Sequence, residues 1–196
     1  MGYISFVKTV VPRGQYMDRE KMGERYIIHL DPVEDKAMDA YVCVECSVPI
    51  ADYDSKLVQE AYEEWKTKMQ ERALTNAIRS KVAEITSYDT SDKVNGFKLN
   101  GSVVWLDKAT RVGLMNSTTI AKAAGQQTTT LWLGESKLEV DCDKAIQLLS
   151  ALEMYALDCF NVTAKHKKMV SEMTSVEQVE AFDITADYPK QLEMTV

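Results

Sequence analysis

The first fifty residues contain three mainly apolar runs, separated by polar segments, that predict strands. Residues 3–11, 25–30 and 40–48 are rich in β-branched and aromatic residues, and Pro49 ends the last run. We expect a small antiparallel sheet from them, in an N-terminal β domain covering 1–53. The charged, glycine-containing segment 12–23 between the first two runs is typical of a surface loop.

From residue 54 the apolar positions change to steps of three and four, which predicts one amphipathic helix over 54–86. The apolar positions are Val58, Ala61, Tyr62, Trp65, Met69, Ala73, Ile78, Val82 and Ile85. Such a helix is about 45 Å long at the usual rise per residue. This length suits a helix that connects two domains or one that packs against copies of itself. The polar segment 86–93 is expected to form a boundary.

The remainder, 94–196, predicts a C-terminal domain in which a hairpin leading into a capped helix occurs twice. In the first unit Asn100-Gly101 fits a type I′ turn, Asp107 caps the following helix, and Gly125 ends it. Gly113, inside that helix, is expected to pack closely against a neighbouring backbone, because glycine lowers helix stability by about 1 kcal/mol relative to alanine.

The second unit spans 128–140, with Gly134 expected in a type II′ turn, and Asp141 caps its helix. Leu131 and Leu133 should face Leu138 and Val140 across the hairpin. The helix carries a wide apolar face for the core, formed by Ala145, Leu148, Leu149, Leu152, Tyr155, Ala156, Cys159 and Phe160.

The tail of the chain predicts one further helix and one further strand. Ser175 and Gln178 form a capping box that starts a short helix with Val176, Val179 and Phe182 turned inward. Residues 191–196 are suited to an added strand. The fold class is therefore α+β: a small N-terminal antiparallel sheet, a long connecting amphipathic helix, and two short β-hairpins packed on helices.

Charge and composition exclude several classes of protein. The net charge is -7 and the pI is about 5.0, with no basic cluster, so a nucleic-acid partner is not expected. No apolar run approaches the roughly 20 residues needed to span a bilayer, and the N-terminus lacks the features of a signal peptide. We expect no membrane partner.

The cysteines are expected to be reduced, buried thiols. Cys43 and Cys46 lie in a β-type run, where residues three apart point to opposite faces, so one zinc ion cannot easily take both. Cys142 and Cys159 fall within one helix and do not pair with each other. No metal site is expected.

Candidate catalytic groups are few. His29 and His166 have no recognisable nucleophile near them, and both are expected to be structural or exposed. The glycine spacings match no phosphate-binding loop. A carboxylate site would draw on Asp141, Asp143, Glu153 and Asp158, but Asp at a helix start is better explained by capping. We therefore expect no enzyme activity and no cofactor.

The tryptophans favour a role in binding other proteins. Trp65, Trp105 and Trp132 are each suited to a core, but Trp105 and Trp132 belong to short hairpins with exposed edges, and aromatic residues are enriched at the centres of protein interfaces. Whether these two face the core or a partner is left open by the sequence.

Residues Asn95 to Pro189 resemble a domain of unknown function found in tailed bacteriophages and prophages, especially those of gut bacteria, in proteins encoded near tail-fibre and tail-assembly genes. The similarity is carried by VNGFKLNGSVVWLDKATRVGLMNSTTIAKAAGQQTTTLWLGE, DKAIQLLSALEMYALDCFNVTAKHK and VEAFDITADYP. Asp107 with Arg111, Ala123-Ala124-Gly125 and Trp132 fill the pattern of that family.

The resemblance implies a non-enzymatic virion protein of the tail or a fibre attachment, found in the virion and, during assembly, in the host cytoplasm. Its expected partners are other virion proteins and further copies of itself, since phage appendages are rotationally symmetric. The interface candidates are Trp65, Trp105, Asp107, Arg111 and Trp132. Two alternatives remain open: a fibre-assembly chaperone that is absent from the mature virion, and, less favoured, an enzyme or small-ligand-binding protein.

Overall fold

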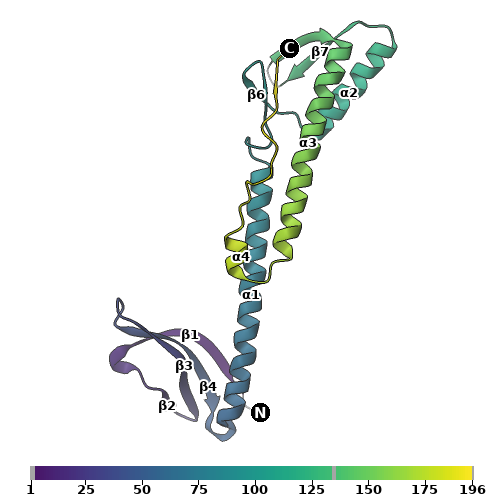
Figure 1. Cartoon of the computed structure of the whole chain (residues 1–196). Coiled ribbons are helices and arrows are strands. Elements are labelled where there is room, and N and C mark those ends of the chain that lie inside the picture. The colour runs from purple at the N-terminus through teal and green to yellow at the C-terminus, as the bar shows by residue number, and fades with distance from the viewer. Residues whose placement is uncertain (1–2, 134–135, 196) are drawn as a thin grey trace. The chain divides into compact units, whose positions relative to one another are not determined.

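The computed structural model describes residues 3–133 and 136–195 of the chain (Figure 1). The fold is α+β, as the sequence predicted. The chain divides into two compact units, one ending at Ala73 and the other beginning at Leu74. The boundary falls inside the long helix α1 (Ser55–Asp89), which continues a few residues beyond the predicted end at 86.

The N-terminal unit contains an antiparallel four-stranded sheet with the strand order β1-β4-β3-β2. Its strands are β1 (Ser5–Pro12), β2 (Arg19–Met22), β3 (Arg25–Asp35) and β4 (Ala40–Pro49). Three of these were predicted. The prediction of a loop over 12–23 was wrong in part, because β2 lies in that segment: a charged sequence without alternation becomes a strand by pairing with β3 across a turn in which Gly23 has a φ of +61°.

The core of this unit lies between one face of the sheet and the first turns of α1. Cys46 and Val48 on β4 are fully buried beside Val58 of α1. The ring of Phe6 lies 5.7 Å from that of Tyr62 and 5.8 Å from that of Trp65. Trp65 is therefore part of the packing that holds α1 to the sheet.

The cysteines of β4 behave as their spacing predicted. Cys46 belongs to the core under α1, whereas Cys43, three residues away, is buried outside that cluster. All four cysteines of the chain are free thiols, and burial raises the pKa of Cys46 to about 11. These side chains pack as small apolar groups.

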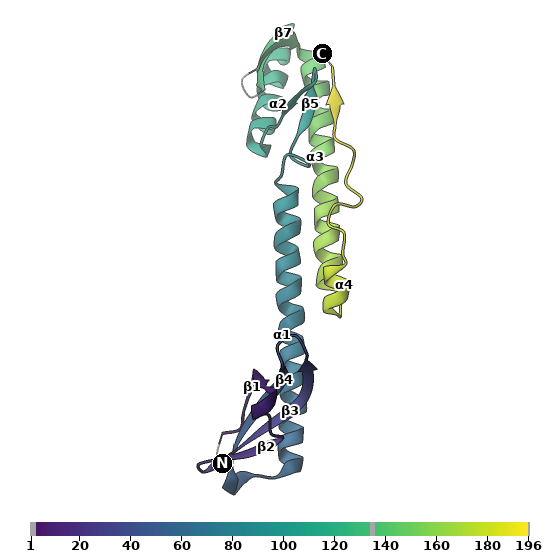
Figure 2. The same cartoon turned by 90° about the vertical axis from the view of Figure 1, so that its left-hand side faces the viewer.

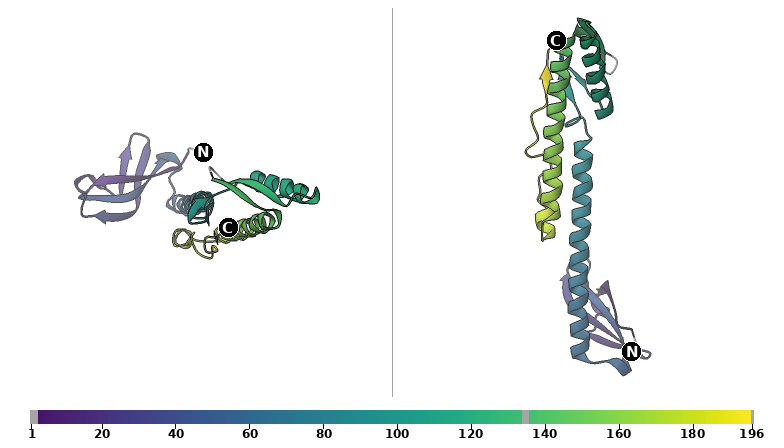
Figure 3. Two further views of the ribbon diagram at one scale, coloured as in Figure 1. Left: turned by 90° about the horizontal axis from the view of Figure 1, so that it is seen from above. Right: turned by 90° about the vertical axis from the view of Figure 1, so that its right-hand side faces the viewer.

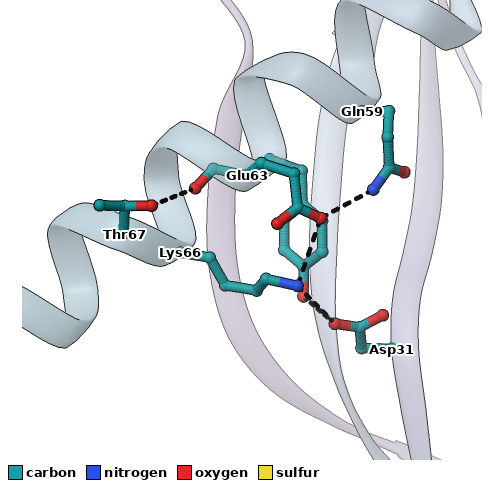
Figure 4. A network of polar contacts seen from close by, with 6 residues as sticks. Asp31, Gln59, Glu63, Lys66 and Thr67 are labelled. Carbon is teal, nitrogen blue, oxygen red and sulfur yellow. Dashed lines mark hydrogen bonds and ion pairs between the residues drawn. The ribbon is translucent and has the colours of Figure 1, made fainter.

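A polar network joins α1 to a bulge in β3, where Asp31 has a φ of +47° (Figure 4). The Tyr62 hydroxyl donates to the Asp31 carboxylate over 2.8 Å, and the Lys66 ammonium lies 3.5 Å from the same carboxylate. Lys66 also lies 3.3 Å from Glu63, which accepts a hydrogen bond from Gln59. The network fixes which turn of the helix faces the bulge.

The C-terminal unit contains the two predicted hairpins. Their strands are β5 (Phe97–Leu99) with β6 (Ser102–Val104), and β7 (Thr128–Leu133) with β8 (Ser136–Asp141). Asn100 and Gly101 have φ values of +49° and +85°, which confirms the type I′ turn. Leu131 pairs with Leu138, as predicted, whereas Leu133 pairs with Ser136 and Val140 with Thr129, so the predicted pairing of Leu133 with Val140 was wrong. The turn predicted around Gly134 lies outside the described residues.

The predicted strand at the end of the chain is also present. It is β9 (Glu193–Met194), which pairs in parallel with β5 and so extends the first hairpin to three strands (Figure 2). To reach this position, the chain runs back along the C-terminal unit after α4 (Val176–Glu180). Ser175 caps α4 as predicted, although the Gln178 side chain accepts from the backbone amide of Thr174, not from that of Ser175.

Two further helices of this unit, α2 (Lys108–Ala123) and α3 (Cys142–Ser171), lie side by side (Figure 3). Asp107 caps α2, and Gly125 follows its end with a φ of +87°, as predicted. Asp141 caps α3. The prediction for Gly113 was wrong: apart from its own helix, an added Cβ there would meet no atom of the described residues within 4 Å, so this glycine packs against none of their backbone.

One face of α3 forms the main core with both hairpins. The buried members are Val94, Phe97, Leu99, Leu106, Leu131, Leu133, Val140, Ala145, Leu148, Leu149, Leu152, Tyr155 and Cys159. Farther along, Val170 of α3 packs with Ile85 of α1 and Val179 of α4 in a second cluster. The predicted core position of Phe160 was wrong, because its side chain is 64% exposed.

This difference between two phenylalanines can be tested. Replacing Phe97, which is fully buried, with alanine should lower the free energy of unfolding by roughly 3–5 kcal/mol, since it removes apolar contacts and leaves a cavity. Phe160→Ala, the matched control, should change it by less than about 0.5 kcal/mol. Urea denaturation followed by circular dichroism measures both. A similar loss for the two variants would contradict the assignment of Phe160 to the surface.

Candidate functional site

A groove in the C-terminal unit lies where the chain leaves β6, enters α2 and meets the side of α3. Its volume is about 440 Å³. Its lining residues come from the end of α1, the segment before α2, the first turn of α2 and the middle of α3: Asp89, Asn95, Trp105, Asp107, Lys108, Arg111, Glu153, Ala156, Leu157, Cys159 and Phe160. Both apolar and charged side chains therefore line it.

Arg111 holds the wall of this groove together. Its side chain is only 7% exposed. The Nε group donates to the Glu153 carboxylate over 2.7 Å, and the Nη1 group donates to the Leu106 carbonyl over 2.7 Å. The guanidinium carbon lies 5.2 Å from the centre of the Trp105 ring. A planar guanidinium can satisfy a carboxylate, a carbonyl and an aromatic face at once, which a lysine ammonium cannot do as well.

Asp107 fixes the start of α2 beside that wall. One carboxylate oxygen accepts from the Thr110 amide over 2.9 Å, and the other accepts from the Thr110 hydroxyl over 2.6 Å. These hydrogen bonds, the hydroxyl one first, hold the pKa of Asp107 below its ordinary value. Asp107 therefore caps α2, and Arg111, one turn later, ties the same helix to Glu153 and to the Leu106 carbonyl.

The apolar part of the groove is a stripe on α3. Leu157 and Phe160 follow Glu153 at helical spacing and are 47% and 64% exposed. Helices α2 and α3 run antiparallel, since Lys122 near the end of α2 pairs with Asp143 at the start of α3, and Arg111 pairs with Glu153. Because α2 begins opposite Glu153, it does not cover the next two turns of α3.

Two hydrogen bonds near the groove join α3 to the end of α1 and the segment that follows it. The Tyr155 hydroxyl donates to the Val94 carbonyl over 3.0 Å, and the Thr163 hydroxyl donates to Asp89 over 2.7 Å. Cys159 is 4% exposed, and burial raises the pKa of its thiol. A protonated, buried thiol is a poor nucleophile, so Cys159 contributes packing.

Three of the five interface candidates meet at this groove: Trp105, Asp107 and Arg111. Trp132 is 59% exposed on β7 and does not line the groove, whereas Trp65 packs on Phe6 in the N-terminal unit.

The sequence analysis did not single out Leu157, and it placed Phe160 in the core, whereas both side chains are exposed. Phe160 follows Cys159 by one residue, which turns it about 100° away from the buried side of α3. Phe160 lies at the edge of the apolar face of α3, and this was the only indication of its exposure in the sequence. The place where α2 begins decides that this edge of the face is exposed.

Of the four carboxylates considered for an acidic site, three have separate partners and the fourth, Asp158, is exposed on α3. Asp141 caps α3, Asp143 pairs with Lys122, and Glu153 pairs with Arg111. Within residues 3–133 and 136–195, no cluster of three or more His, Cys, Asp or Glu side chains is arranged to hold a metal ion. In the same residues, no helix has the length and apolar character of a membrane span.

The two histidines lie apart. His29 on β3 faces the Met17 carbonyl at 2.5 Å from its Nδ1 atom. His166 on α3 is 2% exposed, and its ring meets those of Phe182 and Tyr188 edge-on at 5.1 and 5.6 Å. Among the described residues, its Nδ1 atom has no hydrogen-bond partner.

His166 therefore packs the returning C-terminal segment against α3. Burial lowers its pKa, which outweighs the opposite influence of the nearby carboxylates of Asp187 and Asp183, while Lys165 adds to the lowering.

No protein-family model, no curated protein and no solved structure matches the chain.

The clamp of Arg111 should contribute to stability. Arg111→Ala leaves the Leu106 carbonyl and Glu153 without their donor, and we expect it to lower the free energy of unfolding by about 2 kcal/mol. Lys122→Ala is the matched control, because Lys122 makes another ion pair between α2 and α3 but is 48% exposed, and it should cost less than about 0.5 kcal/mol. Urea unfolding curves measure both. Equal losses would show that burial of the Arg111 pair has no special effect.

The pH dependence of stability should reflect His166. A histidine whose folded-state pKa is lowered stabilises the fold fully above its unfolded-state value of about 6.5, and this stabilisation is lost as the pH falls below that value. We expect the urea midpoint of the wild type to drop between pH 7.5 and 5.5, and this drop to be smaller in His166→Phe. The same drop in both proteins would show that another group is responsible.

Proposed function

We propose that the protein is a structural component of a bacteriophage virion, in the tail or in a fibre attachment, and that it acts by holding other virion proteins, without catalysis. In this proposal it is present in the host cytoplasm during assembly and in the virion afterwards. The single observation that carries the proposal is the exposed apolar stripe of Leu157 and Phe160 beside the fixed wall of Trp105 and Arg111.

The stripe has the properties of a docking surface. Aromatic and arginine side chains dominate the energetic centres of protein interfaces, and those centres lie in pockets that exclude water when the partner binds. Here the pocket is already formed, because Asp107 fixes the start of α2 and Glu153 fixes Arg111. A partner that places an apolar side chain over Phe160 would bury it at little cost in ordering this protein.

The sequence resemblance supports the phage assignment. The residues that carry the likeness to the phage tail-associated domain include Asp107 and Arg111, and these have definite physical roles at the groove as the helix cap and the clamp. A family that shares this pair is expected to share the wall that the pair builds. The partner would then be another tail or fibre protein.

The alternative is an assembly chaperone for the tail fibre. A chaperone would use the same kind of exposed apolar stripe, but it would release its partner before the virion matures. The two functions therefore differ in whether the protein remains in the particle.

Mass spectrometry of virions purified from the phage or prophage that encodes the chain tests the proposal. We expect the wild-type protein to be retained at a constant ratio to the tail proteins. The double variant Leu157→Ser/Phe160→Ala should be depleted from particles at least about tenfold while staying folded, since both side chains are exposed. Met169→Ser is the matched control, because Met169 is 43% exposed on α3 outside the groove, and it should be retained.

Other outcomes would count against the proposal. Recovery of the wild type bound to fibre protein in lysates but not in virions would favour the chaperone. Its absence from both fractions would contradict a role in assembly. Equal retention of the groove variant and the Met169 variant would show that the groove is not the contact.

A further inference from the structure

The N-terminal sheet has two edges that differ in kind. One edge is β2, which has four residues, of which Arg19, Glu20 and Lys21 are charged. The other edge is β1, which has eight residues and only one charged side chain, Lys8. Along its whole length β1 pairs with β4, from Ser5 opposite Ser47 to Pro12 opposite Ala40.

A long edge strand with few charges, such as β1, is unusual in a monomeric protein. The outer side of an edge strand presents backbone groups that can pair with another strand, and proteins usually prevent this with short edge strands, charges or proline. In β2 the first two of these devices are present. In β1 the only such residues are Lys8 and the terminal Pro12, so Phe6 to Val11 can pair with an incoming strand.

A row of exposed valines continues up to this edge. Val10 of β1 lies opposite Val42 of β4, and Val42 lies opposite Val33 of β3. The three side chains are 52%, 38% and 66% exposed. Directly opposed residues point to the same face of a sheet, so the valines form one apolar row across three strands and end at β1.

We propose that two copies of the chain associate through their β1 strands, which pair antiparallel about a twofold axis at Val10. The two four-stranded sheets then become one sheet of eight strands. The valine row of one copy continues into the row of the other, in the order Val33, Val42, Val10 and then the same residues of the second copy in reverse.

The position of the axis is chosen so that like charges are kept apart and the two valine rows meet. In an antiparallel pair, directly opposed residues point to the same face of the sheet. A twofold axis perpendicular to the sheet also keeps each side chain on its own face, so one residue of β1 must lie directly opposite the same residue of the second copy. If that residue were Lys8, two like charges would be directly opposed, which is destabilising. With Val10 on the axis, Lys8 lies opposite Pro12 of the second copy, and Thr9 lies opposite Val11.

A second copy fits this edge better than an unrelated strand. Any extended segment could satisfy the backbone of β1, but a copy also supplies a matching row of three valines at the required level of the sheet. Val10 of each copy then lies beside Val10 of the other, and the two rows join into one apolar row across the combined sheet. This association does not depend on the proposed virion role and concerns a different surface from the groove on α3.

Light scattering coupled to size-exclusion chromatography on the full chain tests the proposal. We expect the wild type to elute with twice its monomer mass of 22.1 kDa. Val10→Lys places two positive charges opposite each other and should raise the dissociation constant at least about tenfold. Val33→Lys is the matched control, because the same change is made in the same exposed row but two strands away from the edge, and it should stay dimeric.

A cysteine cross-link tests the axis directly. Val10→Cys should give a reducible covalent dimer on mild oxidation, whereas Val33→Cys should give none, because its copies are separated by the strands between them. Circular dichroism establishes that each variant is folded.

A monomeric wild type overturns the inference, as does dissociation by Val33→Lys to the same extent as by Val10→Lys, which would indicate packing of one sheet face on another. These outcomes leave the virion test untouched, since that test concerns retention in particles.

Discussion

The C-terminal unit depends on the burial of one face of helix α3. This face carries Leu148, Leu149, Leu152 and Tyr155, and it forms a common core with Phe97 of the first hairpin and Leu131 of the second. Neither two-stranded hairpin is long enough to be stable alone. Each instead places its apolar residues on the same helix, and the end of the chain returns to add β9 to the first hairpin. One buried helix surface therefore organises elements that are far apart in the sequence.

The same arrangement creates the groove. Helix α3 is longer than helix α2, which packs on it. The part of α3 that α2 leaves uncovered carries the exposed side chains of Leu157 and Phe160. The clamp of Arg111 sets where the covered part ends, since it ties the first turns of α2 to Glu153 and to the Leu106 carbonyl. An element that stabilises the fold thus also sets the border of the surface proposed for binding.

In the N-terminal unit, one part of the sheet face is covered by a helix and another part is exposed. The part of the face near Phe6 and Cys46 is covered by α1, whose orientation is fixed by the contacts of Tyr62 and Lys66 with Asp31. The part near Val10 and Val42 is left exposed. A sheet that is partly covered by its own helix and has one edge strand with a single charged residue, Lys8, is suited to association with a further strand. The two apolar surfaces proposed for contacts, one in each unit, have different geometry and need not bind the same partner.

The local elements could be predicted from the sequence because their causes are local. Asn100-Gly101 needs positive φ angles, Asp107 and Asp141 supply oxygen atoms to amides two or three residues away, and the spacing of Leu148, Leu149 and Leu152 is a property of one helix. The tertiary structure decided what depends on distant neighbours. Strand β2 exists because β3 lies beside it, and Gly113 has open space because no other element in the described part of the chain approaches it. Phe160 is exposed because α2 begins opposite Glu153, and the sequence does not state where one helix will stop covering another.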